Sequence, residues 1–182
     1  MQTRMIIVMA VLVLLAAAWF IYDRLRSKRL QQRFGPVYHE TLSEIGNRRR
    51  AEAELQRREI HAEELRARPL NSADRGRFLS QWKRCQARFV DDPSGAVDDA
   101  NELLVEVMRT RGYAADNLHA RTTDIAAAYP HQASRYRQAC EILERHRSSP
   151  VSTDNLRTAF LDYRDLFEDL VGGYDETLKR AS

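Results

Sequence analysis

The chain has little of what builds sheets, turns and redox centres: seven glycines, five prolines and two cysteines in 182 residues. Sheet folds need more turn residues and a strand-like alternation of polar and apolar residues, and this sequence has neither. Both cysteines, Cys85 and Cys140, fall at apolar helical positions, which suits buried thiols in a reducing compartment. A disulfide between them would require an oxidising location. These scarcities indicate an all-α protein.

Catalytic and metal-binding motifs are also missing. The sequence contains no P-loop, no Gly-x-Gly-x-x-Gly loop and no Gly-x-Ser-x-Gly elbow. The Glu-x-x-His pattern of helical metal sites is absent, and the reversed pair His61 and Glu64 has no second copy. The other histidines are scattered: His39, His119, His131 and His146. We therefore predict no enzymatic activity, no cofactor and no metal ion.

The positive charge of the chain is confined to its first part. Residues 1–35 hold six basic and one acidic side chain, whereas residues 36–182 hold 23 basic and 25 acidic ones. Because binding to nucleic-acid phosphates needs a basic excess, which the larger part lacks, nucleic acid is excluded as a partner. About 145 residues follow the basic part, which is enough for one domain with its own hydrophobic core.

One long hydrophobic run stands near the start of the chain. Residues 5–22 read MIIVMAVLVLLAAAWFIY and carry no charge. As a helix they rise about 27 Å, close to the thickness of the bilayer core, so we predict a transmembrane helix over 5–23. Trp19 and Tyr22 suit the headgroup layer at its end. The rival interpretation is a cleaved signal peptide ending near Ala18, but the run is long and its basic residues follow it.

The charges beside this run predict its orientation. Only Arg4 precedes it, whereas a basic segment over residues 24–35 follows it, with a single acid, Asp23, between the two. The basic residues of that segment are Arg24, Arg26, Lys28, Arg29 and Arg33. The positive-inside rule places residues 1–4 outside and the rest of the chain in the cytoplasm. We expect these five side chains to contact the membrane surface and anionic lipid headgroups, unless they serve only to fix the topology.

The remainder reads as one long polar helix followed by a bundle. Gly35-Pro36 ends the first helix, and a helix over 36–68 with seven acids and seven bases ends at Pro69. A heptad would place Arg58 in the seam, which disfavours a coiled coil. We expect this stalk to lie along the edge of an antiparallel bundle over 70–171, with a flexible tail over 172–182. Dimerisation through the stalk, giving a homo-oligomer, is the alternative.

The bundle helices show strong apolar faces and clear ends. Asn71-Ser72, Asp92-Pro93, Pro130 and Ser152-Thr153 are start signals, and Gly112 is a stop signal. Aromatic residues recur at helical spacing, which favours a core over a ligand cavity. The aromatics that would line such a cavity are Trp82, Tyr136 and Tyr163. Arg111 lies on the apolar face of its helix, where we expect it to reach towards solvent or to pair with an acid.

Four stretches together resemble a known group of proteins: RFGPVY (33–38), RFVDDP (88–93), VMRTRGY (107–113) and YRDLF (163–167). They are similar to a family of uncharacterised bacterial proteins that have one amino-terminal membrane helix, a basic run and a helical cytoplasmic domain. The resemblance covers nearly the whole chain, although the family pattern favours proline after Gly-Tyr, where this chain has Ala114. It implies a location in the bacterial inner membrane and brings no activity.

These observations favour a membrane-anchored helical module that binds an unidentified protein partner at the cytoplasmic face. The tether raises the effective concentration of a weak binding surface at the membrane. We expect the partner to bind the stalk over residues 38–67. The alternative is a membrane-tethered sensor or carrier that holds a small molecule between the bundle helices.

Overall fold

The computed structural model describes the backbone of residues 2–67 and 70–172, and the side chains of all of these except 2–8, 10 and 67. The described residues form helices and no strand, which confirms the all-α class. The helices are α1 (Gln2–Phe34), α2 (Pro36–Ile45), α3 (Arg48–Ala67), α4 (Ser72–Asp91), α5 (Pro93–Arg111), α6 (Leu118–Ala128), α7 (Pro130–Ser148) and α8 (Thr153–Gly172). The predicted helix end at Pro69 and almost all of the predicted tail lie outside the described residues.

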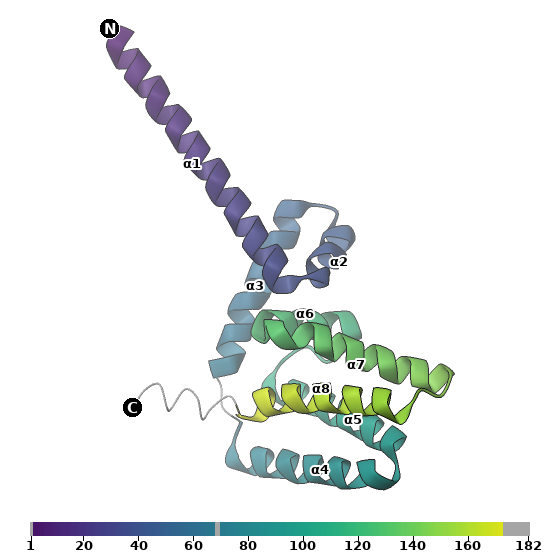
Figure 1. The fold of residues 1–182 in the computed structure, drawn as a ribbon. Coiled ribbons are helices and arrows are strands. Elements are labelled where there is room, and N and C mark those ends of the chain that lie inside the picture. Colours follow the sequence, from purple (N-terminus) through teal and green to yellow (C-terminus); the bar gives the residue numbers. More distant parts are fainter. Residues whose placement is uncertain (1, 68–69, 173–182) are drawn as a thin grey trace. The chain divides into compact units, whose positions relative to one another are not determined.

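The chain divides into two compact units, residues 1–54 and residues 55–182. The first unit begins with α1, which runs without a break through the predicted membrane segment and the basic segment (Figure 1). It ends where predicted, because Gly35 adopts a positive φ of 52° and Pro36 opens α2. Ala67, at the end of α3, already belongs to the second unit.

The single long helix predicted over residues 36–68 is wrong. The chain forms α2 and α3 instead, because Gly46 takes up a left-handed conformation with φ 66° and ends α2. Asn47 then caps the next helix, since its side chain accepts a hydrogen bond from the backbone nitrogen of Arg50 at 3.2 Å. The break turns the start of α3 back towards α1.

No helix in the described part of the chain is both long enough and apolar enough to cross a membrane. Of the membrane segment predicted over 5–23, the side chains of residues 5–8 and 10 lie outside the described residues. The transmembrane helix stays a prediction.

The second unit is a bundle of antiparallel helices. Figure 1 shows α4, α5, α8 and α7 side by side, and α6 packs on α7. Single residues turn the chain at two places, Asp92 between α4 and α5 and Tyr129 between α6 and α7. Connections this short join antiparallel neighbours, as predicted.

Aromatic rings fill the centre of this bundle. Trp82 of α4 stacks on Phe160 and Phe167 of α8, with ring centroids 5.0 and 4.7 Å apart. Tyr136 of α7 and Tyr163 of α8 are fully buried, and their rings lie 5.9 Å apart. The interpretation of these rings as core residues is confirmed.

Candidate functional site

The five basic residues predicted to contact the membrane surface all lie on the last turns of α1. Arg24, Lys28 and Arg29 are exposed, whereas Arg26 and Arg33 are half-buried. Arg24 and Lys28 stand one turn apart on one face, and the guanidinium of Arg24 lies 4.7 Å from the ring centre of Phe20. The structure thus presents three of the five to solvent, and their contact with lipid stays a prediction.

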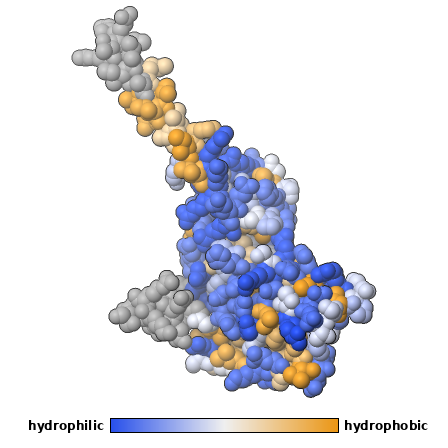
Figure 2. Space-filling view, viewed as in Figure 1, coloured by the Kyte–Doolittle hydropathy of each residue, from blue (hydrophilic) through white to orange (hydrophobic). Residues whose placement is uncertain are grey.

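An exposed apolar surface precedes these basic residues. Every residue over 11–22 is exposed, so the surface extends around the whole helix rather than along one stripe. Leu14 is 69% exposed and Trp19 is 60% exposed. Figure 2 shows this apolar stretch of α1 in orange, ending at hydrophilic residues drawn in blue. A monomer in water rarely exposes so continuous an apolar surface, which indicates that something covers it.

The fold brings three further arginines to the end of this apolar surface. Arg48 of α3 approaches α1, where its Nη2 lies 3.6 Å from Asp23 and also donates a hydrogen bond to Ser27. Arg49 and Arg50 follow on the exposed surface. Sequence reasoning did not place these residues beside the basic segment, because the turn at Gly46 was missed. The signal was present as three successive arginines after a Gly-Asn pair.

A buried carboxylate holds α1, α2 and α3 together behind these arginines. The Oε1 atom of Glu52 accepts hydrogen bonds from Ser27 at 2.7 Å, from Tyr38 at 2.9 Å and from Arg48 at 2.9 Å. Burial alone would raise the pKa of Glu52, but the three hydrogen bonds outweigh it and hold that pKa below its ordinary value. Burial and the neighbouring carboxylate raise the pKa of Tyr38. The Glu52 carboxylate is therefore ionised at neutral pH, and it acts as a buried anchor for the three helices and not as a proton donor.

A hollow of about 470 Å³ lies beside this anchor in the first unit. It is lined by Asp23, Asn47, Arg48, Arg49 and Glu52. Arg48 engages both carboxylates and the side chain of Asn47 caps α3, so Arg49 is the charged lining residue that makes no ion pair among the described residues. The chemistry of the hollow suits a small anion better than a metal ion, since a cation would compete with the guanidinium for the carboxylates.

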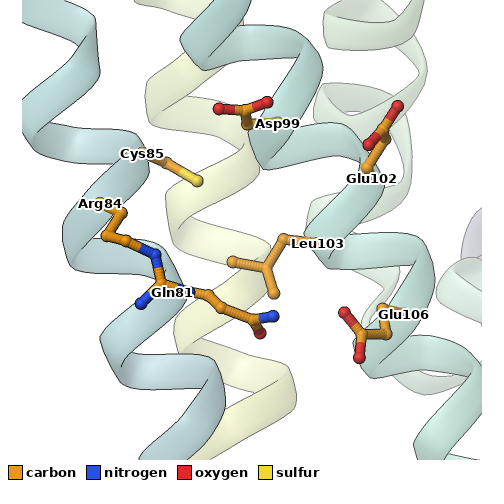
Figure 3. A pocket seen from close by; sticks show the side chains of 7 residues that line it. All are labelled: Gln81, Arg84, Cys85, Asp99, Glu102, Leu103 and Glu106. Carbon is orange, nitrogen blue, oxygen red and sulfur yellow. The ribbon is translucent and has the colours of Figure 1, made fainter.

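A second, smaller hollow lies between α4 and α5 of the bundle, with a volume of about 220 Å³. Figure 3 shows carboxylates of α5, Asp99, Glu102 and Glu106, across from Gln81 and Arg84 of α4. Two of these acids are already paired, Asp99 with Arg88 at 2.7 Å and Glu106 with Arg77. The hollow is smaller than the 300–1,000 Å³ typical of ligand pockets. We interpret it as a groove between α4 and α5 that is lined by ion pairs, and not as a ligand pocket.

Cys85 is a buried thiol, as predicted, whereas Cys140 is half-buried. Burial, and next the carboxylate of Asp99, raises the pKa of Cys85. Burial likewise raises the pKa of Cys140, although Tyr163 donates a hydrogen bond to its sulfur at 3.5 Å. A nucleophilic cysteine needs a lowered pKa, and neither thiol has one.

Two charged side chains of the bundle, Arg111 and Asp124, are buried. Arg111 was expected to reach solvent or to pair with an acid; it is buried instead and donates hydrogen bonds to backbone carbonyls of α3 and α8. Asp124 of α6 accepts a hydrogen bond from the backbone nitrogen of Ala114 at 2.7 Å and from Arg58 at 3.3 Å. Arg58, whose place in the heptad seam disfavoured a coiled coil, thus links α3 to α6. Both contacts are structural.

No group of three metal-ligating side chains gathers among the described residues. His61 and Glu64 lie 4.0 Å apart on the exposed face of α3, as an isolated pair. The side chains predicted to line a ligand cavity, Trp82, Tyr136 and Tyr163, pack as core residues, and the small-molecule alternative stays a prediction.

Comparison of the chain with protein-family models, with curated proteins and with solved structures finds no match. The resemblance to a family of bacterial membrane proteins therefore stays a prediction.

Proposed function

We propose that this chain is a single-pass membrane protein whose helical bundle serves as a protein-interaction or scaffold module at the cytoplasmic face of the bacterial inner membrane. The observation that carries the proposal is the exposed apolar surface over residues 11–22 of α1, ending at exposed basic side chains. A bilayer covers an apolar helix on all sides at once, whereas a docking protein covers one face.

The dimensions of α1 support this proposal. The helix has 33 residues, about 50 Å at 1.5 Å per residue, which exceeds the roughly 30 Å of a bilayer core. The apolar run over residues 5–22 accounts for about 27 Å of that length. Trp19 and Tyr22, both exposed, come at its carboxyl end, where aromatic rings favour the headgroup layer.

The outward face of α3 is the proposed partner surface. Its apolar side is already occupied, because Leu55, Ala62 and Leu65 are buried. Since those residues are the ones a coiled-coil seam would need, self-association through the stalk is disfavoured. The opposite side presents a mixed polar surface around Ile60, an apolar residue that is 53% exposed. Its exposed neighbours are Gln56, Arg57, His61 and Glu64.

The first test is membrane location and topology in a bacterial host. The full chain is expressed, membranes are extracted with alkaline carbonate, and reporters active on one side of the membrane are fused after residue 35 and at the carboxyl terminus. We expect the chain to stay in the membrane pellet and both reporters to indicate the cytoplasm. Extraction into the soluble fraction overturns the anchor, and two external reporters overturn the orientation.

The second test addresses the partner surface. A photo-crosslinking amino acid replaces Ile60 in the full chain, and the same amino acid replaces Leu79, a 41% exposed residue on α4, as the matched control. We expect a discrete crosslinked species from position 60 and none from position 79. The proposed surface is wrong if position 60 gives no adduct or if both positions give the same one.

A further inference from the structure

The contact between Arg48 and α1 places the first residue of α3 close to the end of the apolar run. The guanidinium of Arg48 lies against Asp23 and Ser27, and Asp23 directly follows Tyr22, the last residue of that run. Residues 23–27 lie about 2 to 8 Å beyond Tyr22 along the helix axis. The headgroup layer on one side of a bilayer is about 5 to 8 Å thick. Arg48 is therefore at headgroup depth if α1 spans the membrane.

We propose that the start of α3 and the end of α1 form one composite cationic surface that binds the phosphate groups of anionic phospholipids. The α1 residues are Arg24 and Lys28, and the α3 residues are Arg49 and Arg50, with Arg48 joining the two helices. This inference rests on the proposed membrane anchor. It adds residues of α3 that lie 13 to 15 positions after the end of the basic segment predicted from the sequence.

Depth favours the α3 arginines over part of that predicted segment. Arg33 lies about 16 Å beyond Tyr22 along α1, which is outside the headgroup layer, and it is half-buried. Arg49 and Arg50 follow Arg48 directly and are exposed. A surface made of both helices therefore holds more cations at lipid depth than α1 does alone.

The charges around this contact are left available for an external anion. Four cationic side chains take part in no ion pair among the described residues: Arg24, Lys28, Arg49 and Arg50. In the bundle, by contrast, Arg77, Arg88 and Arg147 each bind two carboxylates. Arg48 satisfies both nearby acids, Asp23 and Glu52, so these acids are engaged away from the outer arginines.

The placement of these arginines also works against the stability of α3. A helix amino terminus carries a partial positive charge, so cations in its first turn are unfavourable. Residues 48–50 fill that turn with three arginines, and no acid stands there. Anionic lipid phosphates would offset this repulsion, so lipid binding explains why three arginines stand at the start of α3.

The test uses the full chain in micelles of a neutral maltoside detergent. Phosphatidylglycerol is titrated into the micelles, and native mass spectrometry measures the fraction of protein that carries the lipid; phosphatidylcholine is the neutral reference. The double variant Arg49→Gln with Arg50→Gln removes two charges and leaves Arg48 and the Glu52 cluster intact. The control, Arg84→Gln with Arg109→Gln, removes two charges from exposed positions of the bundle.

We expect the Arg49/Arg50 variant to bind phosphatidylglycerol about 25-fold more weakly, about fivefold for each charge, and the control to bind like the wild type. Equal binding by all three proteins overturns the composite surface. Loss of lipid binding in the presence of 10 mM inorganic phosphate also overturns it, because a free anion would then be the preferred ligand.

Carbonate extraction of the same proteins separates this inference from the proposed function. A wild-type chain found in the soluble fraction removes the anchor and the lipid surface together. A wild-type chain that stays in the membrane, with unchanged lipid binding in the Arg49/Arg50 variant, leaves the anchor standing and overturns only the composite surface.

Discussion

The Nη2 atom of Arg111 donates a hydrogen bond to the backbone carbonyl of Leu65 at 2.8 Å, although 46 positions separate them in the sequence. The same guanidinium donates to the carbonyl of Leu170 and, at 3.3 Å, to that of Arg66. These carbonyls belong to the last turns of α3 and α8, where helices leave acceptors unsatisfied and carry partial negative charge. One buried cation therefore caps two helices at once.

Replacing Arg111 by methionine is expected to lower the free energy of unfolding by about 3 kcal/mol, since it leaves buried carbonyls without donors. Urea unfolding of the full chain in detergent, followed by circular dichroism, measures the effect. The control is Arg109→Met, an exposed arginine in the same turn of α5, for which a change within about 0.5 kcal/mol is expected. Equal losses in the two variants would show that the caps contribute little.

Gly112, directly after α5, is expected not to tolerate a side chain. Its φ is +88°, and an added Cβ would lie 3.2 Å from Cδ2 of Leu65. We predict that Gly112→Ala lowers the free energy of unfolding by about 1–2 kcal/mol, because alanine is strained in the left-handed region. The same urea experiment checks it.

Gly76 provides the matched control with the opposite sign. It lies within α4, and an added Cβ there meets nothing within 4 Å. Gly76→Ala is expected to stabilise the chain by about 0.5–1 kcal/mol, since alanine favours the helix. Two changes of the same sign would contradict the conformational explanation.

Helix ends set by local chemistry could be predicted from the sequence. Asp92 ends α4 and caps α5, because its side chain accepts a hydrogen bond from the backbone nitrogen of Gly95 at 2.9 Å. Gly35 and Gly112 end their helices with positive φ. Each signal needs only neighbouring residues, so one sequence suffices to read it.

The contacts that define the candidate surface could not be predicted in this way. A glycine inside a polar helix costs only about 1 kcal/mol, so Gly46 was compatible with one long helix. Missing that turn hid the approach of Arg48 to Asp23, which joins two helices. Helical spacing alone also does not decide which apolar residues at helix ends are buried, since Val90 is 82% exposed and Leu118 is 38% exposed. Such contacts depend on tertiary packing, which helical spacing does not encode.

Glu52 is expected to make the first unit sensitive to acid. Its pKa in the folded chain lies below the ordinary value of 4.5, so its stabilisation is complete above that pH and is lost as the pH falls through the folded pKa. Glu52→Gln is expected to cost about 1–2 kcal/mol at pH 7 and to remove this acid step. Hydrogen exchange of residues 23–54, compared between pH 7 and pH 3.5, measures both effects.

Glu44→Gln, at an exposed position of α2, is the control for this experiment. It is expected to keep the wild-type protection at pH 7 and the wild-type loss in acid. An acid step that persists in Glu52→Gln would assign the pH dependence to another carboxylate and would remove the buried anchor from the account of the first unit.

Cys85 and Cys140 are expected to resist alkylation in the folded chain. Burial raises the pKa of both thiols, so few thiolates form at pH 7.5. The reagent also has little access to Cys85, which is buried, and restricted access to Cys140, which is half-buried. With iodoacetamide we expect rates at least about 30-fold below that of a control cysteine introduced as Gln138→Cys, an exposed position on α7 near Cys140. Mass spectrometry of timed samples gives the three rates.

A native cysteine that reacted as fast as the control would be an activated thiol, and the prediction that the chain has no catalytic nucleophile would then be wrong.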